Sequence, residues 1–210
     1  MRQVLPILSS IMSKQRLAKW ERWLTTRIQP EVIGLHMRRQ VFRRVGEILE
    51  ANGDLPPSYF VEFLQDSYAI TQAVAIRRLS ENNKDSVSLG RLLAEIRSEP
   101  DLLTRDLYIK VSGGDDHDAS FAGSYFEQEF GGSTVDRLDP AVIEGDLQIL
   151  GQSTQTVRHY VDKHVAHHDK NPAAQLPTYS EIDHAIDQIC DLFRRYVSLL
   201  TAVDISLHMH

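Results

Sequence analysis

The chain has 210 residues and a net charge of −6, with 42% hydrophobic and 25% charged residues. These values are ordinary for a soluble globular protein of one domain, and the acidic balance argues against indiscriminate nucleic-acid binding. The single cysteine, Cys190, excludes an intrachain disulfide and a cysteine zinc cluster. The N-terminal apolar run is too short and too interrupted for a signal peptide or a membrane span, so we expect a cytoplasmic protein without membrane contact.

Apolar residues recur at helical spacing along the chain, and the alternation typical of strands is absent from the sequence. Ser58 is placed to cap a helix by accepting a backbone N–H bond. Breaks at proline, glycine and asparagine divide the first half of the chain into predicted helices over residues 13–27, 30–53, 59–79, 88–99 and 100–111.

Residues 112–138 differ in composition, with two glycine pairs and several acidic and aromatic residues. We expect a long, Gly-rich acidic insertion there, because the segment exceeds a minimal helix–helix turn. Asp139 and Pro140 are suited to start a helix that we predict over residues 140–168.

Thr178 and Glu181 match the capping box that opens a last helix. The sequence therefore predicts an all-α antiparallel helical bundle. We expect the N-terminal helices of residues 1–57 to pack on a bundle formed by residues 58–210, in one compact domain.

The end of the helix predicted over 140–168 carries an unusual run of polar side chains. His164 and His168 are four residues apart and share one face of an ideal helix. Arg158 precedes His164 by six residues, which places it about 120° around that helix. A bent helix end would bring these groups together, and a twofold dimer would do so in a composite site. Residues 157–170 include Arg158, His159, Asp162, Lys163, His164, His167, His168, Asp169 and Lys170.

These residue types suit metal-free cleavage of an RNA phosphodiester. A neutral imidazole can accept the proton of a 2′-hydroxyl, and a protonated one can donate to the leaving oxygen. The Arg158 guanidinium can grip a phosphate through two parallel hydrogen bonds, and Asp162, four residues later, could orient it. The spacing Arg-x5-His occurs by chance in many helices, so it is weak evidence alone.

Three stretches of the chain resemble the AbiU-like abortive-infection proteins of the HEPN superfamily: Arg-Arg-Leu at 77–79, Ser-Val-Ser-Leu at 86–89, and Lys-His-Val-Ala-His-His-Asp-Lys at 163–170. The resemblance covers roughly residues 59–203. It implies a small helical bundle that dimerises through its motif helices. For many members it also implies a metal-independent ribonuclease with the signature Arg-x(4 to 6)-His, which Arg158 and His164 fit.

Two positions depart from the family pattern. Val161 stands where the family-like phrase often has arginine, which leaves His167 dependent on Lys163 or Arg158. Ala166 stands where one HEPN branch has a tyrosine that is modified, so the resemblance does not imply regulation through that tyrosine.

The leading hypothesis is a homodimeric ribonuclease toxin of an abortive-infection, toxin–antitoxin or phage-defence system, with RNA as substrate and an antitoxin as a further partner. Arg158 would hold phosphate, His164 would move protons, and His167 would assist or replace it. No metal or other cofactor is expected. The alternative is a non-catalytic helical module of the same fold that binds a partner protein, a nucleotide or RNA. Supporting roles fall to His159, Asp162, Lys163, His168 and Asp169.

Simpler interpretations of the histidines stand beside these. His164 and His168 could be helix-end histidines, stabilised by the helix dipole and bonded to a neighbouring helix. A metal site of His164, His167, His168 and Asp169 is a weaker alternative, because consecutive side chains on a helix point about 100° apart.

Two further clusters are candidates for binding. The arginines of the second predicted helix could track a phosphate backbone of RNA, or could form the solvated side of an amphipathic helix. The acidic run at 115–118 could bind a divalent cation, although a solvated loop is the simpler interpretation. The arginines in question are Arg38, Arg39, Arg43 and Arg44.

Overall fold

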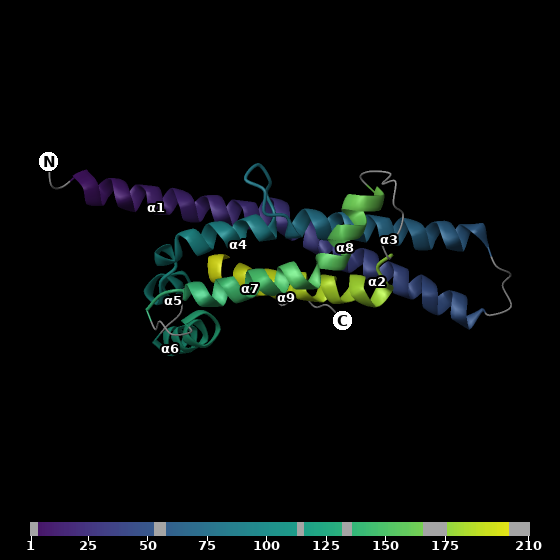
Figure 1. The fold of residues 1–210 in the computed structure, drawn as a ribbon. Helices are drawn as coiled ribbons and strands as arrows, with labels where there is room; N and C mark the ends of the chain where they lie inside the picture. The colour runs from purple at the N-terminus through teal and green to yellow at the C-terminus, as the bar shows by residue number, and fades with distance from the viewer. Residues whose placement is uncertain (1–3, 53–57, 113–115, 132–135, 166–175, 202–210) are drawn as a thin grey trace.

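A computed structural model describes residues 4–52, 58–112, 116–131, 136–165 and 176–201. Within these ranges the chain is all-α, as predicted; the one β-type pairing is an isolated antiparallel bridge between Thr104 and Arg137 (Figure 1). The α-helices are α1 (Val4–Trp23), α2 (Gln29–Ala51), α3 (Tyr59–Ser80), α4 (Leu89–Ser98), α5 (Arg105–Ser112), α6 (Asp116–Phe126), α7 (Pro140–Ser153), α8 (Gln155–Tyr160) and α9 (Tyr179–Thr201).

The first two predicted helices form one continuous rod. The π-helical turn Leu24–Ile28 joins α1 directly to α2, and the rod begins at Val4 rather than near residue 13. Pro30 therefore lies inside the rod, where it lacks an N–H and its ring crowds the preceding turn. The wider turn accommodates it, and the fully buried Leu24 and Ile28 keep the turn packed on the core. The prediction of two separate helices was wrong for this reason.

The starts of α3 and α4 agree with the predictions from the sequence, whereas the start of α5 does not. Ser58 caps α3 by accepting a hydrogen bond from the Phe60 N–H at 3.2 Å, and Ser88 caps α4 by accepting one from Arg91 at 3.0 Å. The single helix predicted over 100–111 is instead a 3₁₀ turn, Pro100–Leu102, followed by α5. The hydroxyl of Thr104 accepts a hydrogen bond from the Leu107 N–H at 3.2 Å, so α5 has its own start signal.

Much of the segment expected as an insertion is folded. Within residues 112–138, α6 packs on α5 and the π turn Glu127–Gly131 follows α6, and Phe126 and Phe130 are fully buried. Aromatic side chains in this segment therefore contribute to the core. In the acidic run at 115–118, Asp116, His117 and Asp118 lie in the first turn of α6, and their side chains are outside the described part of the structure, as is the whole of Asp115.

The helix predicted over 140–168 begins as expected but does not run straight. The Asp139 carboxylate caps α7 by accepting a hydrogen bond from the Ala141 N–H at 2.9 Å. At the fully buried Thr154 the helix is interrupted, and α8 turns away from α7 (Figure 1). The Thr154 hydroxyl donates to the Leu150 carbonyl at 2.7 Å, which satisfies a carbonyl at the interruption.

The last helix, α9, is the centre of the core. Its capping box forms as predicted, because the Thr178 N–H donates to the Glu181 carboxylate at 2.8 Å and the Glu181 N–H donates to the Thr178 hydroxyl at 3.2 Å. Helices α1, α2, α3, α5, α7 and α8 all contact α9. Its fully buried stripe consists of Ile182, Ile186, Ile189, Phe193 and Tyr196, and Cys190 is buried among them as expected.

Helices α2 and α3 form an antiparallel hairpin that extends past the ends of α8 and α9 (Figure 1). Within the described ranges, no helix combines the length and the apolar character that a bilayer crossing requires.

Candidate functional site around the bent motif helix

The interruption at Thr154 directs the polar run against α3. Both α8 and the π turn that follows it, Val161–Val165 (η4), contact α3. Val157 and Val161 are buried and anchor this segment to the core. The polar side chains between them therefore lie toward solvent, and π turns of this kind are frequent at functional sites.

Arg158 and His164, the two residues of the predicted signature, are both partly buried on this segment, whereas His159 is exposed. The His164 ring stacks on the ring of Tyr160, with centroids 5.6 Å apart and planes at 29°. Its Nε2 atom is buried and has no hydrogen-bond partner among the described residues. Most buried polar atoms are paired, so this nitrogen marks a place where a further polar group would satisfy the imidazole.

The carboxylate of Asp162 pairs with a residue of another helix, which the residue spacing within its own helix did not predict. Its carboxylate accepts a hydrogen bond from Arg77 Nε on α3 at 2.5 Å, and Arg77 also approaches Glu81 at 3.6 Å. The hydrogen bond to Asp162 is the main cause that raises the pKa of Arg77 above its usual value. Asp162 thus ties the π turn to α3, and a role of Asp162 in orienting Arg158 stays a prediction.

A hollow of about 400 Å³ lies beside Tyr160. It is lined by Tyr160, by α3 and by the residues around the start of α9. Asp66 and Tyr179 are among its polar groups, and burial together with the charge of Asp66 raises the pKa of the Tyr179 hydroxyl. Tyr160 thus lines the hollow and also stacks on His164, so the hollow adjoins the motif.

Sequence reasoning missed this hollow. Asp66 and Tyr179 come from elements more than a hundred residues apart, and no local spacing links either of them to Tyr160. The only signal in the sequence was an acidic residue in the first half of α3 and an aromatic residue at the start of α9, and such residues are common in helical proteins.

Three of the predicted site residues, His167, His168 and Asp169, lie outside the described residues. Lys163 is exposed at the end of the motif segment. Within the described ranges, no group of three His, Cys, Asp or Glu side chains is arranged to hold a metal ion.

Two of the four arginines predicted to bind RNA join α2 to α9. Arg39 is only 7% exposed, and its guanidinium donates to the Asp187 carboxylate at 2.6 Å. Arg43 donates to the Asp183 carboxylate at 2.8 Å, which raises the pKa of Arg43. These ion pairs cross between helices, so both side chains have a structural role in the monomer.

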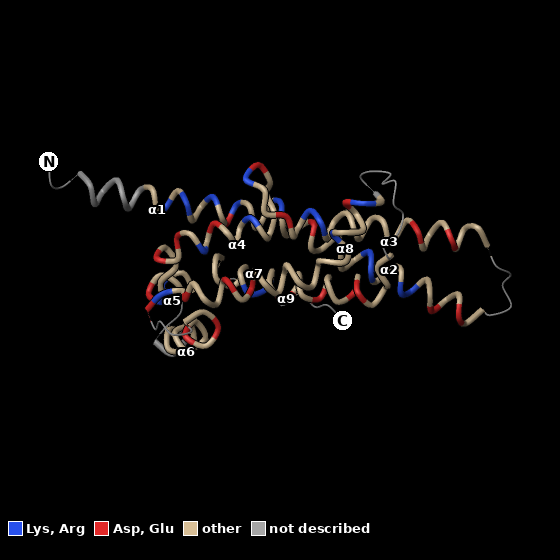
Figure 2. Tube along the Cα trace, viewed as in Figure 1, with Lys and Arg blue, Asp and Glu red and all other residues tan. Residues whose placement is uncertain are grey.

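The other two arginines also form hydrogen bonds or ion pairs within the chain. Arg38 donates from Nε to the side chain of Gln72 on α3 at 3.0 Å, and burial lowers the pKa of Arg38. Arg44 pairs with Glu47, one turn further along α2, at 2.8 Å. Basic and acidic residues are interspersed along these helices rather than gathered in one stretch (Figure 2). A role of the four arginines in binding a phosphate backbone therefore stays a prediction.

Comparison with known proteins adds one finding to this geometry. No curated protein and no solved structure gives a significant match to the chain. A family model named HEPN_AbiU2, described as AbiU2, matches residues 17–209. The match includes the N-terminal helices as well as the range 59–203 on which the resemblance was first seen. Since it covers nearly the whole chain, the protein belongs to the AbiU2 family of HEPN proteins.

Proposed function

We propose that this protein is a metal-independent endoribonuclease of an abortive-infection system, acting in the cytoplasm. The observation that carries the proposal is the buried Nε2 of His164, which has no hydrogen-bond partner among the described residues and lies six residues after Arg158 on a bent helix end. Membership of the HEPN_AbiU2 family supports the same class of function. An antitoxin encoded with such a toxin would be its natural partner.

The chemistry assigns one role to each residue. His164 in its neutral form takes the proton of a 2′-hydroxyl, and the 2′-oxygen attacks the neighbouring phosphorus. The bond from phosphorus to the 5′-oxygen breaks, and the leaving oxygen takes a proton from a protonated histidine. The products are a 2′,3′-cyclic phosphate and a 5′-hydroxyl. Arg158 holds the phosphate and stabilises the charge that develops on its oxygens.

A second copy of the chain would complete the site. Two motif segments that meet across a twofold axis would place the Arg158 of each near the His164 of the other, and would supply the second histidine that the leaving oxygen needs. His167 would assist from the adjoining segment. The stacked Tyr160 would hold the His164 ring in place.

The test uses the purified full chain with RNA in the presence of EDTA. We expect cleavage, and we expect His164→Ala to reduce its rate about 100-fold or more, because it removes a proton-transfer group. Arg158→Ala should reduce the rate by about 100-fold or more as well, because it removes a donor that stabilises the charge on the phosphate. The exposed His184 and Arg22 provide matched controls, since His184→Ala and Arg22→Ala should cleave like the wild type. Circular dichroism of each variant checks that it folds. Full activity in Arg158→Ala and His164→Ala would refute the proposed site.

A second candidate function is supported by Val161. This position often carries arginine in the family-like phrase, but here it holds a buried valine, 4% exposed. A motif with one arginine fewer favours a module that binds RNA, a nucleotide or a protein without cleaving. Overexpression separates the two functions, because a binding module leaves cellular RNA and growth intact whereas a ribonuclease toxin does not.

A further inference from the structure

The hairpin of α2 and α3 has an apolar surface that its own bundle does not cover. We call it the arm face, and it consists of Met37, Val41, Val45 and Ile48 of α2 with Phe60 and Leu64 of α3. The α2 members recur at intervals of four, four and three residues, so they form one stripe along the helix. Met37, Val41, Ile48 and Phe60 are 61%, 62%, 61% and 68% exposed, respectively.

This stripe is separate from the one with which α2 packs on the bundle. Val32 and Leu35 of α2 are buried in the core, as is the aliphatic part of Arg39. A surface helix needs only one such stripe, and its other side is normally polar. A second apolar stripe on the same helix indicates a second packing partner.

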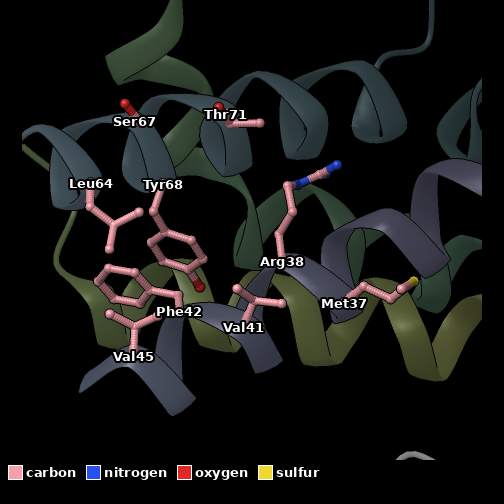
Figure 3. A pocket seen from close by; sticks show the side chains of 9 residues that line it. All are labelled: Met37, Arg38, Val41, Phe42, Val45, Leu64, Ser67, Tyr68 and Thr71. Atoms are coloured by element: carbon pink, nitrogen blue, oxygen red, sulfur yellow. The ribbon is translucent and has the colours of Figure 1, made fainter. Parts of the chain in front are cut away.

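The arm face is hollowed along its middle. A groove of about 330 Å³ lies between α2 and α3, and its lining is almost entirely apolar. The rings of Phe42 and Tyr68 stack across it, with centroids 3.9 Å apart and planes at 2°. Figure 3 shows Leu64 and Tyr68 of α3 facing Phe42 and Val45 of α2. The face thus carries both protruding side chains and a recess between them.

We propose that the arm face binds the arm face of a second copy of this chain, so that two hairpins form a four-helix bundle around a twofold axis. Protruding side chains such as Val41 and Met37 of each copy would fill the groove of the other. Such an isologous contact requires one surface to be complementary to itself, and a ridge beside a recess meets that requirement.

The exposed area fits a stable dimer. A large apolar side chain has about 150–200 Å² of surface, so four that are about three-fifths exposed present roughly 360–480 Å². A standard interface buries about 800 Å² per partner, of which about 60% is apolar, or roughly 480 Å². The two apolar areas are similar, and an exposed apolar patch of this size is often an interaction site.

Charges beside the stripe support the same partner. Arg44 and Glu47 flank it on the side away from α3, and their side chains are 77% and 61% exposed. They form a polar edge beside the apolar stripe, which is the arrangement that protein–protein interfaces show around an apolar centre.

This contact is distinct from the one proposed for the ribonuclease site. On α3, Leu64 and Thr71 line the groove, whereas Asp66 and Ala69 line the hollow beside Tyr160. On an ideal helix these two sets point in roughly opposite directions. Loss of the arm contact therefore does not by itself remove the motif, and the two proposals can fail separately.

Sedimentation equilibrium of the full chain at micromolar concentrations tests the proposal. The wild type should be at least dimeric, and Val41→Glu should raise the dissociation constant about 100-fold, because it buries a charge at the centre of the contact. Val111, a half-exposed valine on α5, gives the matched control, and Val111→Glu should sediment like the wild type. Arg158→Ala should also keep the arm contact.

Cysteine scanning provides a second measurement that does not depend on a disruptive variant. The native Cys190 is buried, so a single cysteine introduced at Val41, Val45 or Ile48 is the accessible thiol. At least one of these should form a disulfide-linked dimer on mild oxidation, while Val111→Cys should not. A monomeric wild type, a Val41→Glu variant with unchanged mass, or a scan without cross-links at all three positions would overturn the proposal.

Discussion

Glu95 of α4 is the acceptor on which the contact between α1 and α4 depends. Its carboxylate is buried and accepts hydrogen bonds from the Trp20 indole at 3.0 Å, from Lys19 at 2.8 Å and from Arg91 at 2.9 Å. Burial alone would raise the pKa of Glu95, but the hydrogen bonds from Lys19 and Trp20 and the nearby positive charges outweigh it and lower the pKa. The charged carboxylate is therefore the form that the fold requires.

Glu95→Ala should lower the free energy of unfolding by about 3 kcal/mol. The buried Trp20 N–H loses its only acceptor in the described structure, which costs about 1–3 kcal/mol. Lys19 and Arg91 are partly exposed, so the loss of each ion pair adds no more than about 1 kcal/mol. Glu95→Gln keeps an acceptor for the indole and should cost less, about 1–2 kcal/mol.

The assay is denaturant unfolding followed by tryptophan fluorescence, because Trp20 itself reports on the contact. The pKa of Glu95 is lowered from 4.5 in the folded protein, so its contribution is complete above about pH 5 and is lost as the pH falls through the folded pKa. The stability difference between the wild type and Glu95→Gln should therefore shrink below pH 4.5. Glu21, an exposed neighbour on α1, is the control, and Glu21→Ala should change stability by less than about 0.5 kcal/mol. Equal losses for Glu95→Ala and Glu21→Ala would refute the reasoning.

Three further predictions concern packing, reactivity and the motif. A Cβ at Gly90 would lie 2.7 Å from the Ser80 carbonyl, so Gly90→Ala should destabilise by about 1–3 kcal/mol, whereas Gly145→Ala, with open space around it, should stabilise by up to about 1 kcal/mol in thermal unfolding. Burial raises the pKa of Cys190 to about 11, so a thiol reagent at pH 8 should modify it only upon unfolding; rapid modification of the folded chain would contradict its burial. Asp162→Asn and Arg77→Gln should each slow RNA cleavage, and the double variant should be no slower than either alone; additive losses would show that they act separately.

Local sequence was sufficient to predict the helical class and the starts of α3, α4, α7 and α9. The caps at Ser58, Ser88, Asp139 and Thr178 form because each hydrogen bond joins residues at most three positions apart. The apolar stripe of α9 could also be predicted from the sequence, because a helix with one buried side repeats its apolar residues at a fixed interval. The motif residues Arg158 and His164 were also found in this way, although their chemical role is a proposal.

Packing between residues far apart in the sequence determined the features of the fold that local sequence did not predict. Pro30 lies within a continuous rod because the buried Leu24 and Ile28 stabilise a π turn that propensity alone disfavours. The helix bends at Thr154 because α8 packs on α3 while α7 packs on α4 and α9.

The ion-pair partners of charged residues could not be predicted from the sequence either. Asp162 meets Arg77 across 85 positions, and Arg39 meets Asp187 across 148. Periodicity tells which side of a helix is apolar, but it does not tell which distant side chain lies opposite a charge. That choice is made only when the helices pack together, because the electrostatic energy of a pair depends on its distance in space and not on its separation along the chain.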